Sequence, residues 1–311
     1  FSSLTPMSTD HPGICRGCHG GCAAWVTVDG GRVVRVRPRA GSPFNLGRMC
    51  VKGLSAPAMM AHPDRLTVPL KRVGERGQGR FEPVSWDEAL SAIAGRLDAF
   101  RRETGPHSVA LGQGTGRPHY FHVIRFANTF GTPNWYEPGL ANCFIPRITV
   151  SNLTYGGFVV GDYYGDTPPR TILFWGHNPL VSGPDGELAF PVKKALAAGA
   201  RGIAVDPRRS ETAQRCDLWL PIRPGTDAAL ALGMARAIIE EGWYDREFVA
   251  AHTLGFDELR AAVAHCTPAW TEVHTGVPAG LMLEAARRYA LDKPSILDWG
   301  VSLEQNPNCL Q

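Results

Sequence analysis

The sequence predicts an α/β protein in which a small N-terminal β-rich module precedes an open, mostly parallel α/β sheet. In the second part, segments typical of strands alternate with segments typical of helices, which indicates a parallel sheet. In the first part, two runs of alternating apolar residues, 23–28 and 32–37, flank Asp29-Gly30-Gly31, a sequence typical of a hairpin turn. We therefore expect a β module over residues 11–65 and the sheet over residues 66–311.

Local patterns predict the elements of the second part. Ser85-Trp86-Asp87-Glu88 is a capping box followed by apolar residues at helical spacing, so a helix is predicted to begin there. Strands are predicted at Ser108–Leu111, Thr171–Trp175, Gly202–Val205, Trp219–Ile222 and Ser295–Trp299. Helices are predicted at Leu188–Ala198, Asp227–Glu241, Asp257–Ala264 and Ala279–Ala290.

The composition is ordinary for a globular protein, with 44% hydrophobic and 20% charged residues. A formal net charge of +3 is too small to indicate a nucleic-acid partner. No apolar run approaches the length of about 18 residues that a membrane span needs, so no span is expected. Eight cysteines, some of them tightly spaced, favour a reducing compartment, and the sequence predicts a cytoplasmic protein.

Four cysteines near the start carry the most chemical information. Cys15, Cys18 and Cys22 lie at gaps of two and three residues, and Cys50 follows much later in the chain. Soft thiolates select zinc or iron–sulfur centres. Zinc sites more often contain two C-x-x-C pairs or histidine ligands, so this spacing favours a cubane iron–sulfur cluster. Zinc, or scattered core and disulfide cysteines, are the alternatives.

Three predicted strands end in polar, glycine-rich loops: Gly176-His177-Asn178-Pro179, Asp206-Pro207-Arg208-Arg209 and Arg223-Pro224-Gly225-Thr226-Asp227. Ligands of open α/β sheets bind beyond the carboxyl ends of the strands. Carboxylate, amide and guanidinium groups suit a nucleotide, because Asp can bind ring N–H groups or ribose and Arg can bind phosphate. Thr226 or Asp227 could equally be only the N-cap of the next helix. Neither G-x-G-x-x-G nor G-x4-G-K-[ST] occurs in the sequence.

Together these motifs resemble the molybdopterin-dependent oxidoreductases of the dimethyl-sulfoxide reductase family. The resemblance covers nearly the whole chain and rests on C-x2-C-x3-C-x27-C-x-K-G, on Pro83–Leu90, and on the three strand-end loops in the family's order. It implies a [4Fe–4S] cluster and a bis(molybdopterin guanine dinucleotide) centre with molybdenum or tungsten. The sequence ends before the family's second dinucleotide-binding half, so we expect an N-terminal portion without the C-terminal half of the fold.

The resemblance also implies roles for individual residues. Cys15, Cys18, Cys22 and Cys50 would ligate the cluster. Lys52 would lie between cluster and pterin, or it could be an ordinary surface lysine. One guanine dinucleotide would be held by Gly176, Asn178, Asp206, Pro207, Arg208, Gly225, Thr226 and Asp227.

In this family the metal's protein ligand is Ser, Cys, selenocysteine or Asp, and the corresponding residue is Cys143, which we expect to bind molybdenum or tungsten. Phe144 follows where formate dehydrogenases have a histidine, which argues against formate oxidation. The run before Cys143 is most similar to that of tungsten hydratases, whose catalytic Asp follows the second cluster cysteine. Here that residue is His19, which would transfer protons or only hydrogen-bond near the cluster. The remaining cysteines are interpreted as buried: Cys216, Cys266 and Cys309.

The resemblance predicts a catalytic subunit that performs two-electron redox chemistry or oxygen-atom transfer on a small-molecule substrate. Electrons would pass through the cluster, and an iron–sulfur electron-transfer subunit is an expected partner. Reduction of sulfur compounds and dehydroxylation of aromatic substrates both suit a Cys-ligated metal. Two alternatives stay open: non-redox hydration of an unsaturated bond by a metal-bound water, and an inactive electron-transfer or assembly subunit that holds only a cluster.

Overall fold

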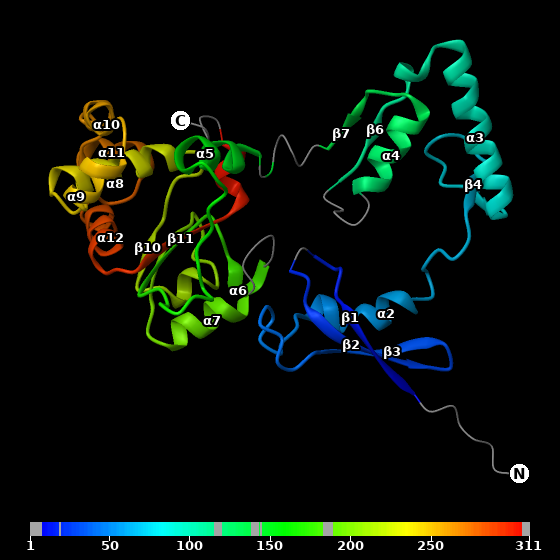
Figure 1. Cartoon of the computed structure of the whole chain (residues 1–311), viewed down its shortest axis with the longest axis horizontal. Coiled ribbons are helices and arrows are strands. Elements are labelled where there is room, and N and C mark those ends of the chain that lie inside the picture. The colour runs from blue at the N-terminus through cyan, green and yellow to red at the C-terminus, as the bar shows by residue number, and fades with distance from the viewer. Residues whose placement is uncertain are drawn as a thin grey trace, which may run out of the picture. The chain divides into compact units, whose positions relative to one another are not determined.

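The computed structural model of the protein describes residues 8–18, 20–114, 120–137, 143, 145–182 and 189–306 (Figure 1). The chain divides into two compact units, which are described separately. The first unit comprises Phe1–Gly13, Ala24–Arg37 and Met49–Ala141; the second comprises Ile14–Ala23, Pro38–Arg48 and Asn142–Gln311. The strands between residues 70 and 136 pair with one another and not with the second unit's sheet.

The first unit contains a three-stranded sheet, order β1-β2-β3, and two short strand pairs. Gly30 and Gly31 have φ of +53° and +77° and connect β2 directly to β3, which confirms the predicted hairpin. Strands β4 and β5 pair antiparallel, whereas β6 and β7 pair parallel. The strands are β1 (Thr9–Ile14), β2 (Ala23–Asp29), β3 (Arg32–Pro38), β4 (Leu70–Arg72), β5 (Phe81–Pro83), β6 (Leu111–Gly112) and β7 (Trp135–Tyr136).

The longest helix described in the first unit, α3 (Trp86–Glu103), begins where the capping box predicted it. The Glu88 backbone N–H donates to the Ser85 hydroxyl at 3.1 Å, which satisfies one of the unpaired N–H groups of the first turn. The other helices of this unit are α1 (Val51–Leu54), α2 (Ala56–Met60), the 3-10 turn η1 (Pro106–Ser108) and α4 (Tyr120–Phe130).

A four-stranded parallel sheet, order β10-β9-β8-β11, forms the centre of the second unit. Its strands are β8 (Thr171–Trp175), β9 (Arg201–Val205), β10 (Leu218–Leu220) and β11 (Ser295–Trp299). The predicted parallel sheet is therefore confirmed, and β8 and β11 have their predicted bounds. The strand predicted at Ser108–Leu111 is wrong as a member of this sheet. Of that segment, Leu111 alone belongs to a strand, and it pairs with Trp135 in the first unit.

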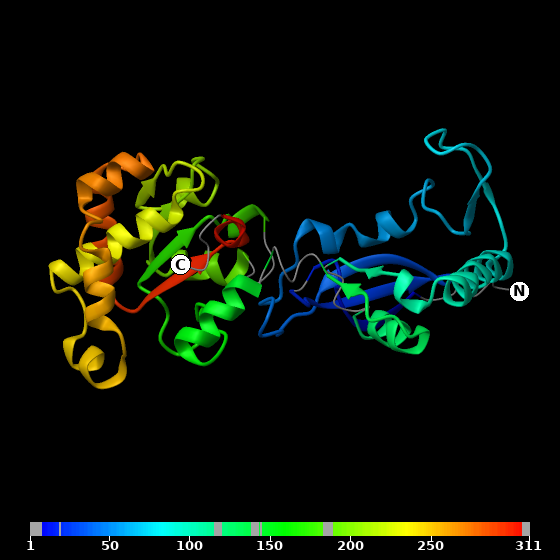
Figure 2. The ribbon, with the colours of Figure 1, turned by 90° about the horizontal axis from the view of Figure 1, so that it is seen from above.

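Helices cover both faces of this sheet (Figure 2). Because side chains alternate along a strand, Leu173 and Ile203 pack on one face against helices α8 and α12, whereas Ile172 and Phe174 pack on the other face near Val192 of α7. The helices of the second unit are α5 (Ile145–Tyr155), α6 (Pro179–Ser182), α7 (Ala189–Ala197), η4 (Ala213–Arg215), α8 (Asp227–Glu240), α9 (Arg246–His252), α10 (Phe256–Val263), α11 (Pro268–Thr275), α12 (Ala279–Leu291) and η5 (Val301–Gln305). Among the described residues, no helix has both the length and the apolar character that crossing a bilayer requires.

Candidate cofactor-binding site

The loops that follow β8, β9 and β10 leave the sheet at one edge. All strand pairs of the sheet are parallel, so their carboxyl ends lie along the same side. The Trp175 indole Nε1 donates to Asp227 Oδ1 at 2.8 Å, which joins the end of β8 to the first residue of α8. The Asn306 side chain donates to the other oxygen of Asp227 at 2.9 Å. The structure thus brings the predicted loops to one edge, with both Asp227 oxygens already hydrogen-bonded.

Asn178 connects the first loop to the segment after β9. Its Oδ1 accepts from the backbone N–H of Thr212 at 3.1 Å and from the Thr212 hydroxyl at 2.6 Å. Its Nδ2 donates to Glu211 at 2.7 Å. A backbone hydrogen bond and this amide lower the pKa of the Glu211 carboxyl, so the acceptor stays ionised at neutral pH. The Asn178 side chain therefore holds two loops together in this structure.

The second loop is ordered by its own polar groups. The backbone N–H of Arg208 donates to Asp206 Oδ1 at 2.8 Å, which forms a tight turn across Pro207. The Arg208 guanidinium is 66% exposed and lies 3.4 Å from Glu211. A solvent-exposed guanidinium at a strand end suits recognition of a phosphate, and the second Asp206 oxygen suits a nitrogen donor of a base.

The third loop is anchored to α11. The Arg223 guanidinium donates to the backbone oxygen of His274 at 2.8 Å, and the Thr226 hydroxyl donates to the backbone oxygen of Arg223 at 2.6 Å. Gly225 has a φ of +82°, a conformation that glycine adopts without strain. Thr226 stands at the N-cap position of α8, but its hydroxyl makes no capping hydrogen bond to the first turn of the helix.

The loop after β8 also packs directly against the segment that follows β11. The backbone N–H of Gly300 donates to Trp175 O at 2.9 Å, and the Ser302 hydroxyl donates to Gly176 O at 3.0 Å. A Cβ on Gly300 would lie 2.0 Å from Gly176 O, so the two backbones touch because neither residue has a side chain. Segment 300–306 is consequently part of the same edge as the predicted loops.

Three of the predicted cluster cysteines belong to the second unit and Cys50 to the first. The backbone N–H of Cys15 donates to Cys22 O at 2.8 Å, which closes the loop that contains Cys18. Cys22 is buried, whereas Cys15 and Cys18 are half-buried. Within the described part of the chain, no three Cys, His, Asp or Glu side chains are grouped closely enough to hold a metal ion. The donor set itself, four cysteines, fits the soft ligation of an iron–sulfur cluster.

Cys143 precedes α5 and is half-buried. One turn further on, Arg147 Nε donates to Glu304 Oε1 at 2.6 Å, and the guanidinium lies 5.3 Å from the centre of the Trp299 ring. Burial raises the pKa of the Glu304 carboxyl, and Arg147 opposes that effect. The helix after Cys143 is therefore tied to η5, and η5 begins at the crossing beside Gly176.

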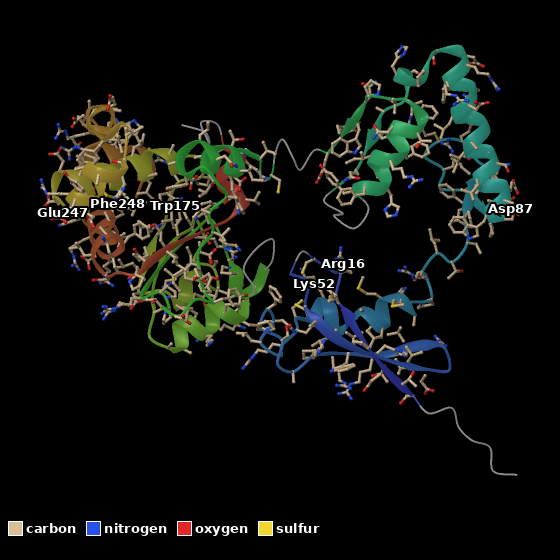
Figure 3. All side chains as sticks on the ribbon, viewed as in Figure 1. Arg16, Lys52, Asp87, Trp175, Glu247 and Phe248 are labelled. Carbon is tan, nitrogen blue, oxygen red and sulfur yellow. The ribbon has the colours of Figure 1, made fainter. Side chains whose placement is uncertain are left out.

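The remaining predicted residues are less informative. Lys52 is exposed on α1, two residues after Cys50 (Figure 3). His19, Phe144 and Cys309 lie outside the described residues. Cys266 is fully buried, and Cys216 lies against Gly202. Desolvation raises the pKa of the Cys216 thiol to about 12, so this thiol is not a nucleophile at neutral pH.

Sequence reasoning missed two sets of polar residues. Asn45 is completely buried; its side chain accepts from Ala23 N–H and donates to Arg48 O, so it links the residue after Cys22 to the segment before Cys50. Asp298 is buried in β11 and bonds to Tyr163 and His177. A polar residue inside an otherwise apolar strand was the available signal for Asp298. For Asn45 the signal was the sequence Asn45-Leu46-Gly47, because asparagine and glycine are typical of tight turns.

Comparison with known protein families finds a matching family for the N-terminal part of the chain and for the part that follows it. Residues 65–309 match the molybdopterin oxidoreductase family, and residues 9–62 match the molybdopterin oxidoreductase Fe4S4 domain. The chain belongs to the molybdopterin oxidoreductase family. Membership implies a [4Fe–4S] cluster and a molybdenum or tungsten bis(molybdopterin guanine dinucleotide) as cofactors.

Individual members of the family are similar to this chain in sequence and in structure. Acetylene hydratase of Syntrophotalea acetylenica is 33% identical over 95% of this chain and 40% of its own length. The molybdopterin-containing subunit of thiosulfate reductase from Salmonella typhimurium is 31% identical over 94% of this chain and 38% of its own length. The solved structure of acetylene hydratase from Pelobacter acetylenicus superposes with a TM-score of 0.81 at 32% identity, covering 96% of this chain and 41% of that chain. The chain therefore spans about two fifths of the length of these molybdopterin oxidoreductases.

Proposed function

We propose that this chain is the cluster-binding and first dinucleotide-binding portion of the catalytic subunit of a molybdenum or tungsten enzyme. Its reaction would be a two-electron oxidation, reduction or oxygen-atom transfer on a small molecule, with electrons passing through a [4Fe–4S] cluster. The observation that carries the proposal is the convergence of the three strand-end loops at one edge of a parallel sheet, in a chain of the molybdopterin oxidoreductase family. An iron–sulfur electron-transfer subunit and a cytoplasmic location belong to the same proposal.

We infer the roles of these residues from the hydrogen bonds that they make. Asp206 and Arg208 keep polar groups open at the edge and would contact the dinucleotide directly. Asn178 and Asp227 already use their side chains to join neighbouring segments, so they would hold the loops in shape for the ligand. Gly176, Pro207, Gly225 and Thr226 would shape the backbone around it. When bound, the metal centre would supply the exchange of electron pairs with the substrate.

Cys143 would be the protein ligand of the metal, Lys52 would lie between cluster and pterin, and the cysteines at 15, 18, 22 and 50 would hold the cluster. Support for Cys143 comes from its position one turn before Arg147, whose ion pair ties α5 to η5. Reduction of a sulfur compound suits a thiolate-bound metal and is the activity named for one relative, thiosulfate reductase. His19 would exchange protons with the substrate.

A second candidate function is non-redox hydration of an unsaturated bond. It is favoured by the similarity to acetylene hydratase in sequence and in structure. In that reaction a metal-activated water would add to the substrate and no net electron transfer would occur.

The two functions are separated by metal analysis and turnover of the full-length protein, purified without oxygen. A redox enzyme should contain about four irons per chain together with molybdenum or tungsten, and it should consume an electron donor or acceptor during turnover. Hydration without net electron flow would favour the second candidate. A protein with iron but neither metal nor pterin would overturn both. Cys143→Ala should abolish turnover and leave the iron content unchanged, whereas Cys266→Ala, in the helical region, should change neither.

A further inference from the structure

The sheet of the second unit has a topological switch point between β8 and β11. The chain moves from β8 to β9 and β10 on one side, and then returns to the other side of β8 as β11. The connection after β8 runs over the α7 face, and the connection after β10 runs over the α8–α12 face. In open α/β sheets, ligands bind outside the carboxyl ends of the strands at such a point.

A hydrogen-bonded group of three side chains occupies this position. Asp298, next to the last residue of β11, accepts from the Tyr163 hydroxyl at 2.5 Å through Oδ2 and lies 2.5 Å from His177 Nδ1 through Oδ1. The Asp298 side chain is only 4% exposed, and that of His177 is 18% exposed. The carboxylate lies on the apolar face of the sheet where Phe174 and Tyr163 pack.

These contacts determine the form of the imidazole. An ionised carboxylate can only accept hydrogen bonds, so the proton of neutral His177 lies on Nδ1 and the lone pair lies on Nε2. The bond from Tyr163 occupies the second Asp298 oxygen, so the carboxylate cannot rotate away from the ring. Among the described residues, His177 Nε2 has no hydrogen-bond partner, whereas the Asn178 and Asp227 side chains at the same edge hydrogen-bond to neighbouring segments.

We propose that His177 is a proton-transferring residue of this site, and that Asp298 and Tyr163 are its positioning residues. The inference rests on the proposed function, because it requires a substrate at the carboxyl edge. In the reductive direction Nε2 of the neutral ring takes up a proton from solvent, and the substrate atom that gains the electron pair then takes this proton from Nε2. The ring returns to its neutral Nδ1–H form, and Asp298 keeps its hydrogen bond to Nδ1 throughout. The electron pair comes from the metal centre of the proposed function.

The positioning role is tested by ¹⁵N NMR of the full chain with ¹⁵N-labelled histidine. We expect the wild-type His177 signals to show the proton on Nδ1, and Asp298→Leu to move it to Nε2, the form that free imidazole prefers. Tyr163→Phe keeps the acceptor and should retain the Nδ1–H form. His274, whose Nδ1 lies 2.8 Å from Trp270 O on α11, is the internal control and should not change in any variant. A His177 signal that is the same in wild type and Asp298→Leu would overturn the positioning role.

Proton transfer is tested in the metal-loaded enzyme. His177→Gln should lower kcat about 100-fold, the usual contribution of a general acid or base, with iron, metal and pterin contents equal to wild type. Because His177 lies in a loop, this variant also serves if Asp298→Leu does not fold. His274→Gln is the matched control and should keep full turnover. Wild-type turnover in His177→Gln would overturn the proposal. Absence of metal and pterin from the wild-type protein would instead overturn the proposed function, while the NMR result would still decide the positioning role.

Discussion

At the scale of single residues, the crossing of Gly176 and Gly300 decides how closely two loops approach at the carboxyl edge. Gly176 has a φ of +59°, and a Cβ there would lie 2.2 Å from the Ser302 hydroxyl. A Cβ on Gly300 would lie 2.0 Å from Gly176 O, which is closer than any real carbon–oxygen contact. Since the obstacle is backbone, it cannot move aside as a flexible side chain would.

Gly300→Ala is therefore expected to destabilise the second unit by about 3 kcal/mol, the upper range for overpacking a tight contact. The matched control is Gly280→Ala on α12, where an added Cβ meets nothing within 4 Å and should stabilise by up to about 1 kcal/mol. Urea denaturation of both variants measures the difference. Equal midpoints would show that the two backbones do not touch.

At the scale of elements, two kinds of contact stabilise the helices. A capping hydrogen bond stabilises the start of α3 in the first unit, and an ion pair joins α5 to η5 in the second unit. The α3 cap is local, because Ser85 and Glu88 are three residues apart. The tie between α5 and η5 is non-local, since Arg147 and Glu304 are 157 residues apart. These two kinds of contact respond differently to substitution.

For the cap, Ser85→Ala should lower the stability of the first unit by about 1 kcal/mol, because the Glu88 N–H loses its acceptor. Ser91→Ala, an exposed position inside the same helix, is the control and should stay within about 0.5 kcal/mol of wild type or gain slightly. Thermal unfolding followed by circular dichroism measures both. A similar loss in the two variants would mean that the serine hydroxyl does not act as a cap.

For the ion pair, Arg147→Met should destabilise the second unit by about 3 kcal/mol at pH 8, because it leaves a carboxylate that is only 5% exposed without its partner. The loss should be smaller at pH 5. Burial already raises the pKa of Glu304, so the folded state binds a proton more readily than the unfolded state, and the stability from this group falls as pH rises through the raised pKa. Denaturation at both pH values measures the effect. Arg147→Met combined with Glu304→Leu should recover most of the stability, and a pH-independent loss would contradict the buried carboxylate.

At the scale of the whole molecule, the proposed [4Fe–4S] cluster would couple metal binding to folding, because Cys15, Cys18, Cys22 and Cys50 would ligate it only in the folded chain. Cluster loading should accordingly raise the stability of the folded protein.

Cys50→Ala is expected to remove one of the four proposed ligands. Iron should fall well below the roughly four atoms per chain of an intact cluster, and the unfolding temperature measured by calorimetry should fall with it. Cys266→Ala, a buried cysteine in the helical region, should retain the iron. Stoichiometric zinc in the wild-type protein, or unchanged iron in Cys50→Ala, would show that these cysteines hold no such cluster.

The sequence by itself determined whatever depends on neighbours along the chain. The Ser85 cap, the Gly30-Gly31 turn and the bounds of β8 and β11 were all predictable, because a few adjacent residues set their backbone conformation. The parallel sheet followed from the alternation of elements, and the family followed from the spacing of the cysteines and the order of the loops.

Only the tertiary structure decided which side chains remain available to a ligand. Asn178 and Asp227 looked like direct ligand contacts in the sequence, but Thr212, Glu211, Trp175 and Asn306 use their polar atoms. Asp298 looked like an ordinary strand residue until β11 returned beside β8 and placed it against His177. The strand pairing that brings residues about 120 positions apart together is a property of the whole sheet, and no local pattern in the sequence encodes it.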